Sequence, residues 1–158
     1  MVKIKKLKKK ILLVVSLVVL ASIILSGCGG SDPVNQSTLM QQANNTIDNY
    51  NNSLENEDVS SMSQYLDSTF QHQSSSTTMT KDEYTSMIQL AFNLGAEFHN
   101  LTMNDKLSEV INDNKVRVSG SLYTEATNVN GIYYTDSFPI QYTVEKKNNT
   151  WLLTYIVD

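Results

Sequence analysis

The chain has 158 residues, with one cysteine and a formal net charge of −4. Six of its twelve basic residues lie within the first ten positions and all sixteen acidic residues lie beyond position 27, so residues 28–158 carry six minus sixteen, or −10. So acidic a domain, with its few bases scattered, lacks the positive surface that nucleic-acid binding needs. A single cysteine also excludes an internal disulfide framework.

The first 28 residues follow the order of an export signal. Lysines at six of positions 3–10 precede an apolar run over 11–25, and small residues stand directly before Cys28. A basic segment, an apolar segment and small residues in this order indicate a signal peptide. The alternative is a transmembrane helix, but about 15 apolar residues fall short of the roughly 20 that span a bilayer.

The segment Leu25-Ser26-Gly27-Cys28 resembles the lipobox of bacterial lipoproteins. The resemblance implies a signal peptide over 1–27, cleavage before Cys28, and a diacylglycerol on its sulfur, with an acylated (palmitate-type) amino terminus in diderm bacteria. Residues 28–36 then read as a flexible tether to a domain over 37–158. The lipid bilayer becomes the first expected partner, and the expected location is the extracytoplasmic face of the cell membrane.

Two helices are predicted at the start of this domain. From Thr38, apolar residues recur at spacings of three and four and form one stripe: Met40, Ala43, Ile47, Tyr50 and Leu54. Asp58 is a good N-cap for a second, short helix with the inward residues Val59, Met62, Tyr65 and Leu66.

A third helix has the clearest boundaries. Thr80 and Glu83 have the spacing of a capping box, and Gly95 suits a left-handed end. The stripe between them is expected to be buried, and it consists of Tyr84, Met87, Ile88, Ala91 and Phe92 or Leu94.

After Gly95 the hydrophobic period changes to two, which predicts antiparallel strands joined by short turns. The expected strands are 97–112, with a bulge near His99, then 116–124, 132–144 and 151–157. Asn130-Gly131 and Asn148-Asn149 are expected to form tight turns. Pro139 argues for a bulge or an edge position. The third strand should turn alternate residues inward, from Ile132 and Tyr134 to Val144.

Helices followed by an antiparallel meander define an α+β domain, here three N-terminal helices on a curved antiparallel sheet that closes into a cone. From Asp58 to Ile156 this order resembles the nuclear transport factor 2-like superfamily, which includes SnoaL-type cyclases and ketosteroid isomerases. The short helix ending Tyr65-Leu66-Asp67, the capped helix at Thr80 and the final strand 151–156 carry the resemblance. It implies that any catalytic acid or base lies inside the cone.

Candidate acids and bases are few. Asp136 shares the inward positions of its strand with Tyr134 and Phe138, and His72 points the same way as Phe70 if that segment is extended. Each has a simpler interpretation, since Asp136 can sit at a strand end in water and the polar loop after His72 favours an exposed imidazole. Asp67 is expected to cap a turn, and His99 to be a surface residue.

No other chemical motif stands out. Two distant histidines without a cysteine or a helix-spaced partner predict no metal site, and no phosphate loop or nucleophile elbow indicates a cofactor or covalent catalysis. Eight tyrosines are the more suggestive set. Those on the sheet fit cross-strand packing, but Tyr123 and Tyr133 are expected on the outer face, where tyrosine favours an interaction surface.

The leading hypothesis is therefore a non-enzymatic, membrane-anchored module that binds a small apolar ligand or an envelope protein, with a possible homodimer through the sheet. An isomerase or cyclase with Asp136 or His72 as base and a tyrosine as proton donor is the alternative from a different class. A third hypothesis, from resemblance alone, is a scaffold component of a conjugation or secretion complex.

Overall fold

The computed structural model describes residues 35–158, so the predicted signal peptide, the lipobox, Cys28 and nearly all of the predicted tether lie outside the described residues. The elements in chain order are α2 (Gln36–Glu55), α3 (Val59–Gln64), β1 (Leu66–Gln73), β2 (Thr78–Thr80), α4 (Lys81–Asn93), β3 (Glu97–Asn112), β4 (Lys115–Thr127), β5 (Tyr133–Lys147) and β6 (Thr150–Val157). Within 35–158, no helix has the length and apolar character that a membrane span requires.

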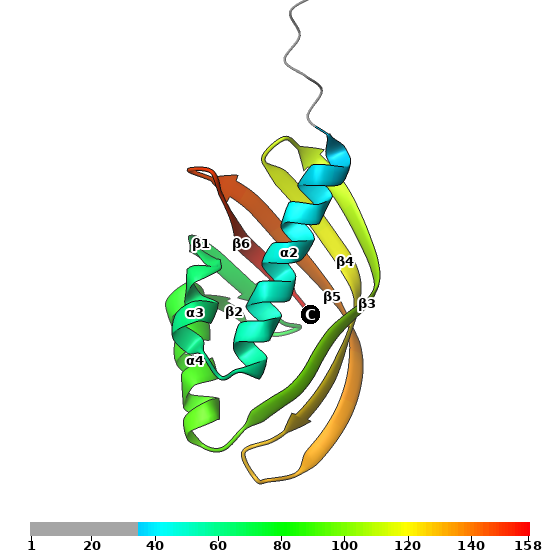
Figure 1. The fold of residues 1–158 in the computed structure, drawn as a ribbon. Coiled ribbons are helices and arrows are strands. Elements are labelled where there is room, and N and C mark those ends of the chain that lie inside the picture. Colours follow the sequence, from blue (N-terminus) through cyan, green and yellow to red (C-terminus); the bar gives the residue numbers. More distant parts are fainter. Residues whose placement is uncertain (1–34) are drawn as a thin grey trace, which may run out of the picture. The chain divides into compact units, whose positions relative to one another are not determined.

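The six strands form one sheet in the order β2-β1-β6-β5-β4-β3. Figure 1 shows the long strands β3, β4 and β5 curving strongly, with α2 lying across the concave side and α3 and α4 beside β1 and β2. The predicted α+β class and curved sheet are confirmed. The prediction is wrong in two respects. β1 runs parallel to β6, which makes the sheet mixed, and β1 and β2 precede α4, so the helices do not all come before the strands.

The end of α3 explains why β1 was predicted only as a short strand or a loop. The short helix α3 ends at Gln64 with Tyr65 as its cap, so Leu66 begins a strand instead of continuing the helix. The strand is polar, and its buried residues do not alternate cleanly, because Asp67 is buried beside Leu66. A period of two was therefore not visible in the sequence of β1.

The helix α2 follows its predicted stripe with a small shift. Its N-cap is Asn35, whose side chain accepts from the Ser37 backbone N–H, so the helix begins at Gln36 and includes the last residue assigned to the tether. Leu39, and not Met40, is the first buried apolar residue of the stripe. Its later members are buried as predicted, among them Ile47 and Tyr50.

The capping box of α4 is present in full, and Gly95 has a φ of +88°, as the sequence predicted. Its buried stripe is narrower than predicted, because only Tyr84 and Ile88 are buried. Met87 and Leu94 are exposed, since α4 covers only the edge of the sheet. Ala91 and Phe92 are half-buried, and Phe92 packs against the core.

Bulges set which faces the strands present. The predicted bulge at His99 is a register shift between Phe98 and Asn100. In β6, Leu153 pairs with Val144 and Tyr155 with Thr143, which leaves Thr154 as an extra residue. An extra residue reverses the alternation of the side chains. Ile156 therefore joins Leu153 in the core, and the strand that reads as apolar on both faces has one main buried face.

Two turn predictions had different outcomes. Asn148 and Asn149 both have positive φ, 51° and 68°, and join β5 to β6 as predicted. The Asn130-Gly131 pair lies in a longer loop, 128–132, which is closed by a hydrogen bond from the Asn128 N–H to the Ile132 carbonyl. Ile132 is consequently exposed and not inward. Pro139 lies in the part of β5 beyond its pairing with β6, the edge position that was predicted.

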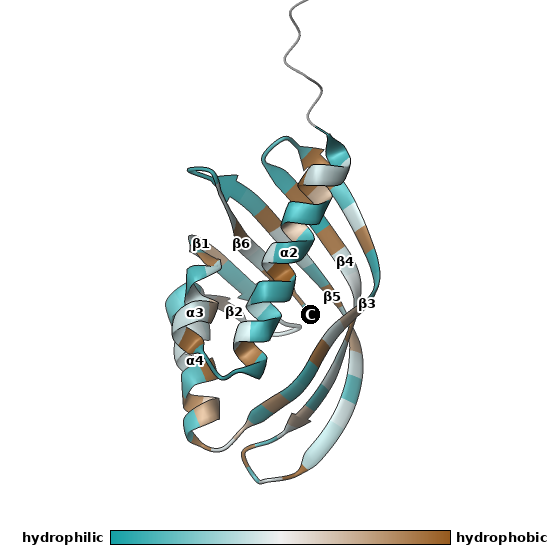
Figure 2. Cartoon of the chain, viewed as in Figure 1, coloured by the Kyte–Doolittle hydropathy of each residue, from teal (hydrophilic) through white to brown (hydrophobic). Residues whose placement is uncertain are grey.

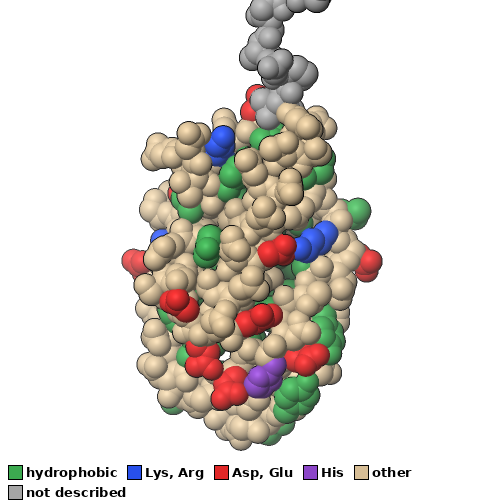
Figure 3. All heavy atoms as spheres, viewed as in Figure 1, with side chains coloured by type: hydrophobic (Ala, Val, Ile, Leu, Met, Phe, Trp, Pro, Cys, Tyr) green, Lys and Arg blue, Asp and Glu red, His purple; other side chains and the backbone are tan. Residues whose placement is uncertain are grey.

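Hydrophobic and hydrophilic bands alternate along the long strands (Figure 2), and the core lies between their concave face and the helices. Its largest fully buried side chains include Ile47, Met62, Phe70 and Val118. Acidic side chains are more widespread than basic ones over the lower half of the face shown in Figure 3. Residues 35–158 contain six basic and fifteen acidic residues, so the described domain carries a formal net charge of six minus fifteen, or −9.

Candidate functional site

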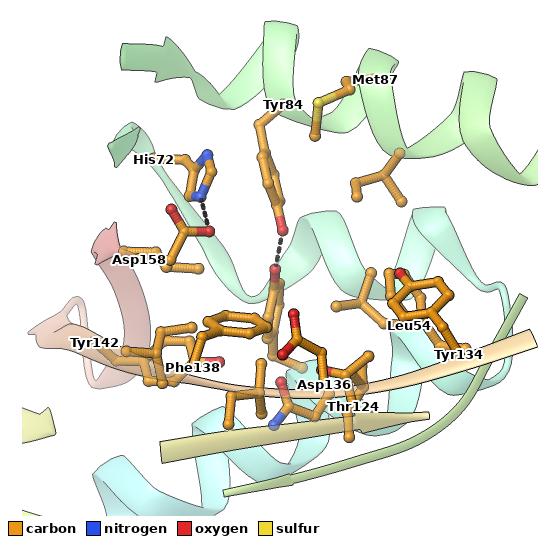
Figure 4. A pocket seen from close by; sticks show the side chains of 18 residues that line it. Leu54, His72, Tyr84, Met87, Thr124, Tyr134, Asp136, Phe138, Tyr142 and Asp158 are labelled. Atoms are coloured by element: carbon orange, nitrogen blue, oxygen red, sulfur yellow. Dashed lines mark hydrogen bonds and ion pairs between the residues drawn. The ribbon is translucent and has the colours of Figure 1, made fainter. Parts of the chain in front are cut away.

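A pocket of about 240 Å³ opens on the concave side of the sheet. Its floor and walls come from α2, β1, α4 and the strands β3, β4, β5 and β6, together with Asp158, the residue after β6. Figure 4 shows the side chains of these elements converging on one space. The pocket is slightly smaller than the 300–1,000 Å³ typical of drug-sized ligand sites.

Two buried tyrosines from different helices meet in this pocket. The hydroxyl oxygens of Tyr50 on α2 and Tyr84 on α4 lie 2.6 Å apart, and either hydroxyl can be the donor. Burial raises the pKa of Tyr84 to about 12 and that of Tyr50 well above its usual value. Both are therefore neutral at physiological pH. One hydroxyl accepts the hydrogen bond from the other. The proton of the accepting hydroxyl is then free to be donated to a bound molecule.

His72 on β1 forms the second polar feature. Its side chain is buried, with 7% of the residue exposed, and its ring lies 5.0 Å from the ring of Tyr84. The Nε2 atom lies 3.1 Å from Oδ2 of Asp158. Because a carboxylate only accepts, Nε2 carries a proton and donates it to Asp158, while Nδ1 has no hydrogen-bond partner. The expectation of an exposed histidine was wrong, since β1 carries the ring under α4.

Asp136 lies at the open side of the pocket. Its strand β5 places it beside Tyr134 and Phe138, as the alternation predicted, and it pairs with Thr124 of β4. Its side chain is exposed to solvent within the pocket, and one carboxylate oxygen accepts from the Ser137 backbone N–H at 2.7 Å. The structure therefore brings both predicted acid–base candidates, Asp136 and His72, to one pocket (Figure 4).

Three buried polar atoms that belong to pocket-lining residues have no hydrogen-bond partner. They are Nδ1 of His72, Oδ1 of Asn51 and Oγ1 of Thr124. An unpaired buried polar group costs about 1–3 kcal/mol, so folded proteins rarely leave several together. The described residues contain three more such atoms, on Asn44, Thr85 and Arg117, which do not line the pocket, so three of the six belong to residues around this cavity.

The other predicted candidates lie outside the pocket. Asp67 accepts from the Thr69 N–H and hydroxyl, as expected for a turn cap, and also from Lys147 Nζ at 2.9 Å. Burial acts to raise the pKa of Asp67, but the hydrogen bonds from Thr69 and Lys147 outweigh it and hold the pKa at about 2. Asp67 is thus a structural carboxylate.

Tyr123, Tyr133 and His99 form a cluster on the outer face of the sheet. Both tyrosine hydroxyls donate to Glu125, over 2.9 and 3.0 Å, and the His99 ring stacks on Tyr133 at 5.8 Å. Tyr133 is exposed as predicted, whereas Tyr123 is half-buried. His99 is a surface residue, as expected. Among residues 35–158 no group of three or more potential ligand side chains is placed to hold a metal ion.

The sequence alone did not identify Tyr50, Tyr84 or Asp158 as members of the site. Both tyrosines lie on apolar helix stripes and read as ordinary core residues. The available clue was a hydroxyl-bearing side chain within each buried stripe, since a buried tyrosine needs a partner. Asp158 gave no local clue, because its partner His72 is 86 residues away in sequence.

No protein-family model matches the chain, and no curated protein sequence matches it. Solved structures match at the level of the fold. A ketosteroid isomerase-like protein from Erwinia carotovora atroseptica superposes with a TM-score of 0.65 and 11% identity, over 75% of this chain and 92% of that one.

An NTF2-like protein from Cytophaga hutchinsonii gives a TM-score of 0.65 and 14% identity, over 78% of this chain and 96% of its own. An NTF2-like protein of unknown function in nutrient uptake from Rhodospirillum rubrum gives a TM-score of 0.64 and 11% identity, over 72% of this chain and 93% of its own. The fold is nuclear transport factor 2-like. At these identities the likeness concerns the fold alone, and an NTF2-like fold by itself specifies no activity.

Proposed function

We propose that this chain is a lipid-anchored extracytoplasmic protein that binds a small molecule in its NTF2-like pocket without transforming it. The observation that carries the proposal is the set of three unpartnered polar atoms, on His72, Asn51 and Thr124, around a cavity of about 240 Å³. Apolar walls with a few convergent polar groups are typical of ligand sites.

The membrane anchor is proposed from the sequence. Cys28 follows an apolar leader and small residues, the pattern of a lipobox, and acyl chains hold a protein durably at a membrane when two or more are attached. We expect Cys28→Ala to move the protein from the membrane fraction to the soluble fraction, while Ser31→Ala leaves it membrane-bound. A Cys28→Ala protein that stays in the membrane would contradict lipidation as the anchor.

Native mass spectrometry of the protein purified from its own membrane tests ligand binding directly. We expect a bound molecule of defined mass that is lost on unfolding. Thr124→Val keeps the side-chain shape but removes an unpaired hydroxyl, so it should raise the stability of the ligand-free protein and lower ligand occupancy. Thr135→Val, on the exposed outer side of β5, is the matched control. A ligand-free protein whose stability falls with Thr124→Val contradicts the proposal.

A second candidate is an isomerase that moves a proton next to a carbonyl. It is favoured by the presence of Asp136 and His72 in the same pocket as the Tyr50–Tyr84 hydroxyl pair. A carboxylate would remove the proton from C2 of a β,γ-unsaturated ketone and return it at C4, while a tyrosine hydroxyl donates to the developing enolate oxygen. Conversion of cyclohex-3-enone to cyclohex-2-enone, followed by absorbance, tests this. Turnover that Asp136→Asn abolishes would replace the binding proposal.

A further inference from the structure

The charged groups of the pocket are predominantly acidic. Asp136 and Asp158 both line it, and no lysine or arginine is among the lining residues from the described part of the chain. His72 is the one titratable base in the lining. Even a protonated His72 would balance only Asp158, with which it pairs at 3.1 Å, and Asp136 would still leave the pocket negative. An anionic ligand would therefore enter against repulsion from the carboxylates.

The walls that surround these carboxylates are largely aromatic. Six aromatic side chains from two helices and two long strands line the cavity: Tyr50, Tyr84, Phe98, Tyr134, Phe138 and Tyr142. Aromatic faces carry negative quadrupole density and attract cations within about 6 Å of the ring centre. Aromatic walls together with carboxylates form an environment that favours a positively charged organic group over a neutral one of equal size.

The unpartnered atoms point to the same ligand chemistry. Oδ1 of Asn51 can only accept, and Nδ1 of His72 accepts when the ring is neutral, because Nε2–H is directed to Asp158. Thr124 Oγ1 can accept as well. A ligand that satisfies these acceptors must bring hydrogen-bond donors, and a protonated amine has up to three donors and no acceptor.

We propose that the pocket binds a small organic ammonium compound, a protonated amine attached to an apolar group. This rests on the proposed ligand-binding function and names its ligand class. The ammonium group lies against Asp136 and the unpaired acceptors, and the apolar part packs among the aromatic side chains. The cavity volume of about 240 Å³ limits the ligand to small amines.

Isothermal titration calorimetry on the full chain in lipid nanodiscs tests this, with empty nanodiscs as the blank. Three probes share one phenyl group: 2-phenylethylammonium, neutral 2-phenylethanol and anionic phenylacetate. We expect the ammonium probe to bind at least about 10-fold more tightly than the alcohol. Asp136→Asn should weaken the binding of the ammonium probe about 5-fold or more and change the affinity for the alcohol less than 2-fold. Asp113→Asn makes the same change of charge at an exposed turn, and it should leave the affinities for the ammonium probe and for the alcohol unchanged.

The outcomes separate the two proposals. If the alcohol or phenylacetate binds as tightly as the ammonium probe, or if Asp113→Asn weakens it as much as Asp136→Asn, the ligand class is wrong. The proposed function survives that result if native mass spectrometry still finds a bound molecule. If none of the probes binds, the ligand class is likewise overturned. An anionic or neutral molecule identified in the purified protein has the same consequence.

Discussion

Tyr50 and Tyr84 join two helices through a single hydrogen bond, with 2.6 Å between their hydroxyl oxygens, inside the pocket. Replacing Tyr84 by Phe leaves the Tyr50 hydroxyl buried without this partner, so we expect a loss of about 1–3 kcal/mol in the free energy of unfolding. The double variant Tyr50→Phe/Tyr84→Phe should lose less than the sum of the single variants, because neither hydroxyl is left orphaned. Urea denaturation of the four proteins measures the coupling, and strictly additive losses would contradict it.

The same pair predicts a loss of stability in alkali. Burial raises the pKa of Tyr84 to about 12, whereas an unfolded tyrosine ionises near 10. The stabilisation is complete below about pH 10 and is lost as pH rises towards 12, because only the unfolded chain then releases the proton. The urea concentration at the denaturation midpoint should decrease as the pH is raised from 9.5 to 11.5. The decrease should be smaller in the double Phe variant. Equal pH dependence in both proteins would contradict this.

The lowered pKa of Asp67 predicts that the protein loses stability as the pH falls in acid. Its pKa of about 2 is below its unfolded value, so its contribution is present above about pH 4 and is lost as pH falls towards 2. Asp67→Asn should lower the free energy of unfolding by about 1–2 kcal/mol at pH 7, a modest loss because the Lys147 partner is partly solvent-screened. At pH 2 the loss should be almost zero, because Asp67 is then largely protonated in the unfolded chain and partly protonated in the folded one. Asp113→Asn serves as the exposed control. A loss that is the same at both pH values would show that Asp67 acts through shape and not charge.

Gly120 allows the close approach of β3 to β4. A Cβ at this position would lie 2.5 Å from the Asn104 carbonyl oxygen and 2.9 Å from Cε of Met103. The methionine can move, but the backbone oxygen cannot without shifting the strand. We therefore expect Gly120→Ala to lower the free energy of unfolding by about 1–3 kcal/mol. Ser119→Ala on the same strand is the control, and thermal melts in which both variants match the parent would contradict the prediction.

The homodimer through the sheet is a prediction, and we propose the outer-face cluster of Tyr123, Tyr133 and His99 as its contact. Tyr133 is 56% exposed and stacks with His99, beside the half-buried Tyr123. If the sheet pairs with a second copy, Tyr133→Ala should shift the species in sedimentation velocity from dimer towards monomer. Leu90→Ala removes a similarly exposed side chain from α4 and should have no effect. A parent protein that is monomeric at 50–100 µM would contradict the homodimer.

The parts of the fold that local chemistry determines were predictable from the sequence. The capping box at Thr80, the stripe through Ile47 and Tyr50, and the Asn148-Asn149 turn each depend on residues within one or two turns of chain. The segment that forms β1 was left open as a strand or a loop, because its stability comes from parallel pairing with β6, more than 80 residues later. Such pairing leaves no pattern in an eight-residue polar strand.

The candidate site was likewise predictable only where local chemistry determines it. Alternation along β5 placed Asp136 on the inner face correctly, since a strand fixes side-chain direction locally. The burial of His72 depends on α4 and on Asp158, which are distant in sequence, so the polar loop that follows it was misleading. The tyrosine pair depends on where the fold places α2 and α4, which no periodicity encodes.

The position of β6 has a consequence for the order in which this molecule can assemble. The last strand of the described chain is inserted between the first strand and β5, so β1 has no long neighbour until residues 150–157 are in place. Pairings of such wide sequence separation close late and slowly. An incompletely synthesised chain would therefore expose β1 and lack the partner of His72, and we expect binding competence to arise only in the final step of folding.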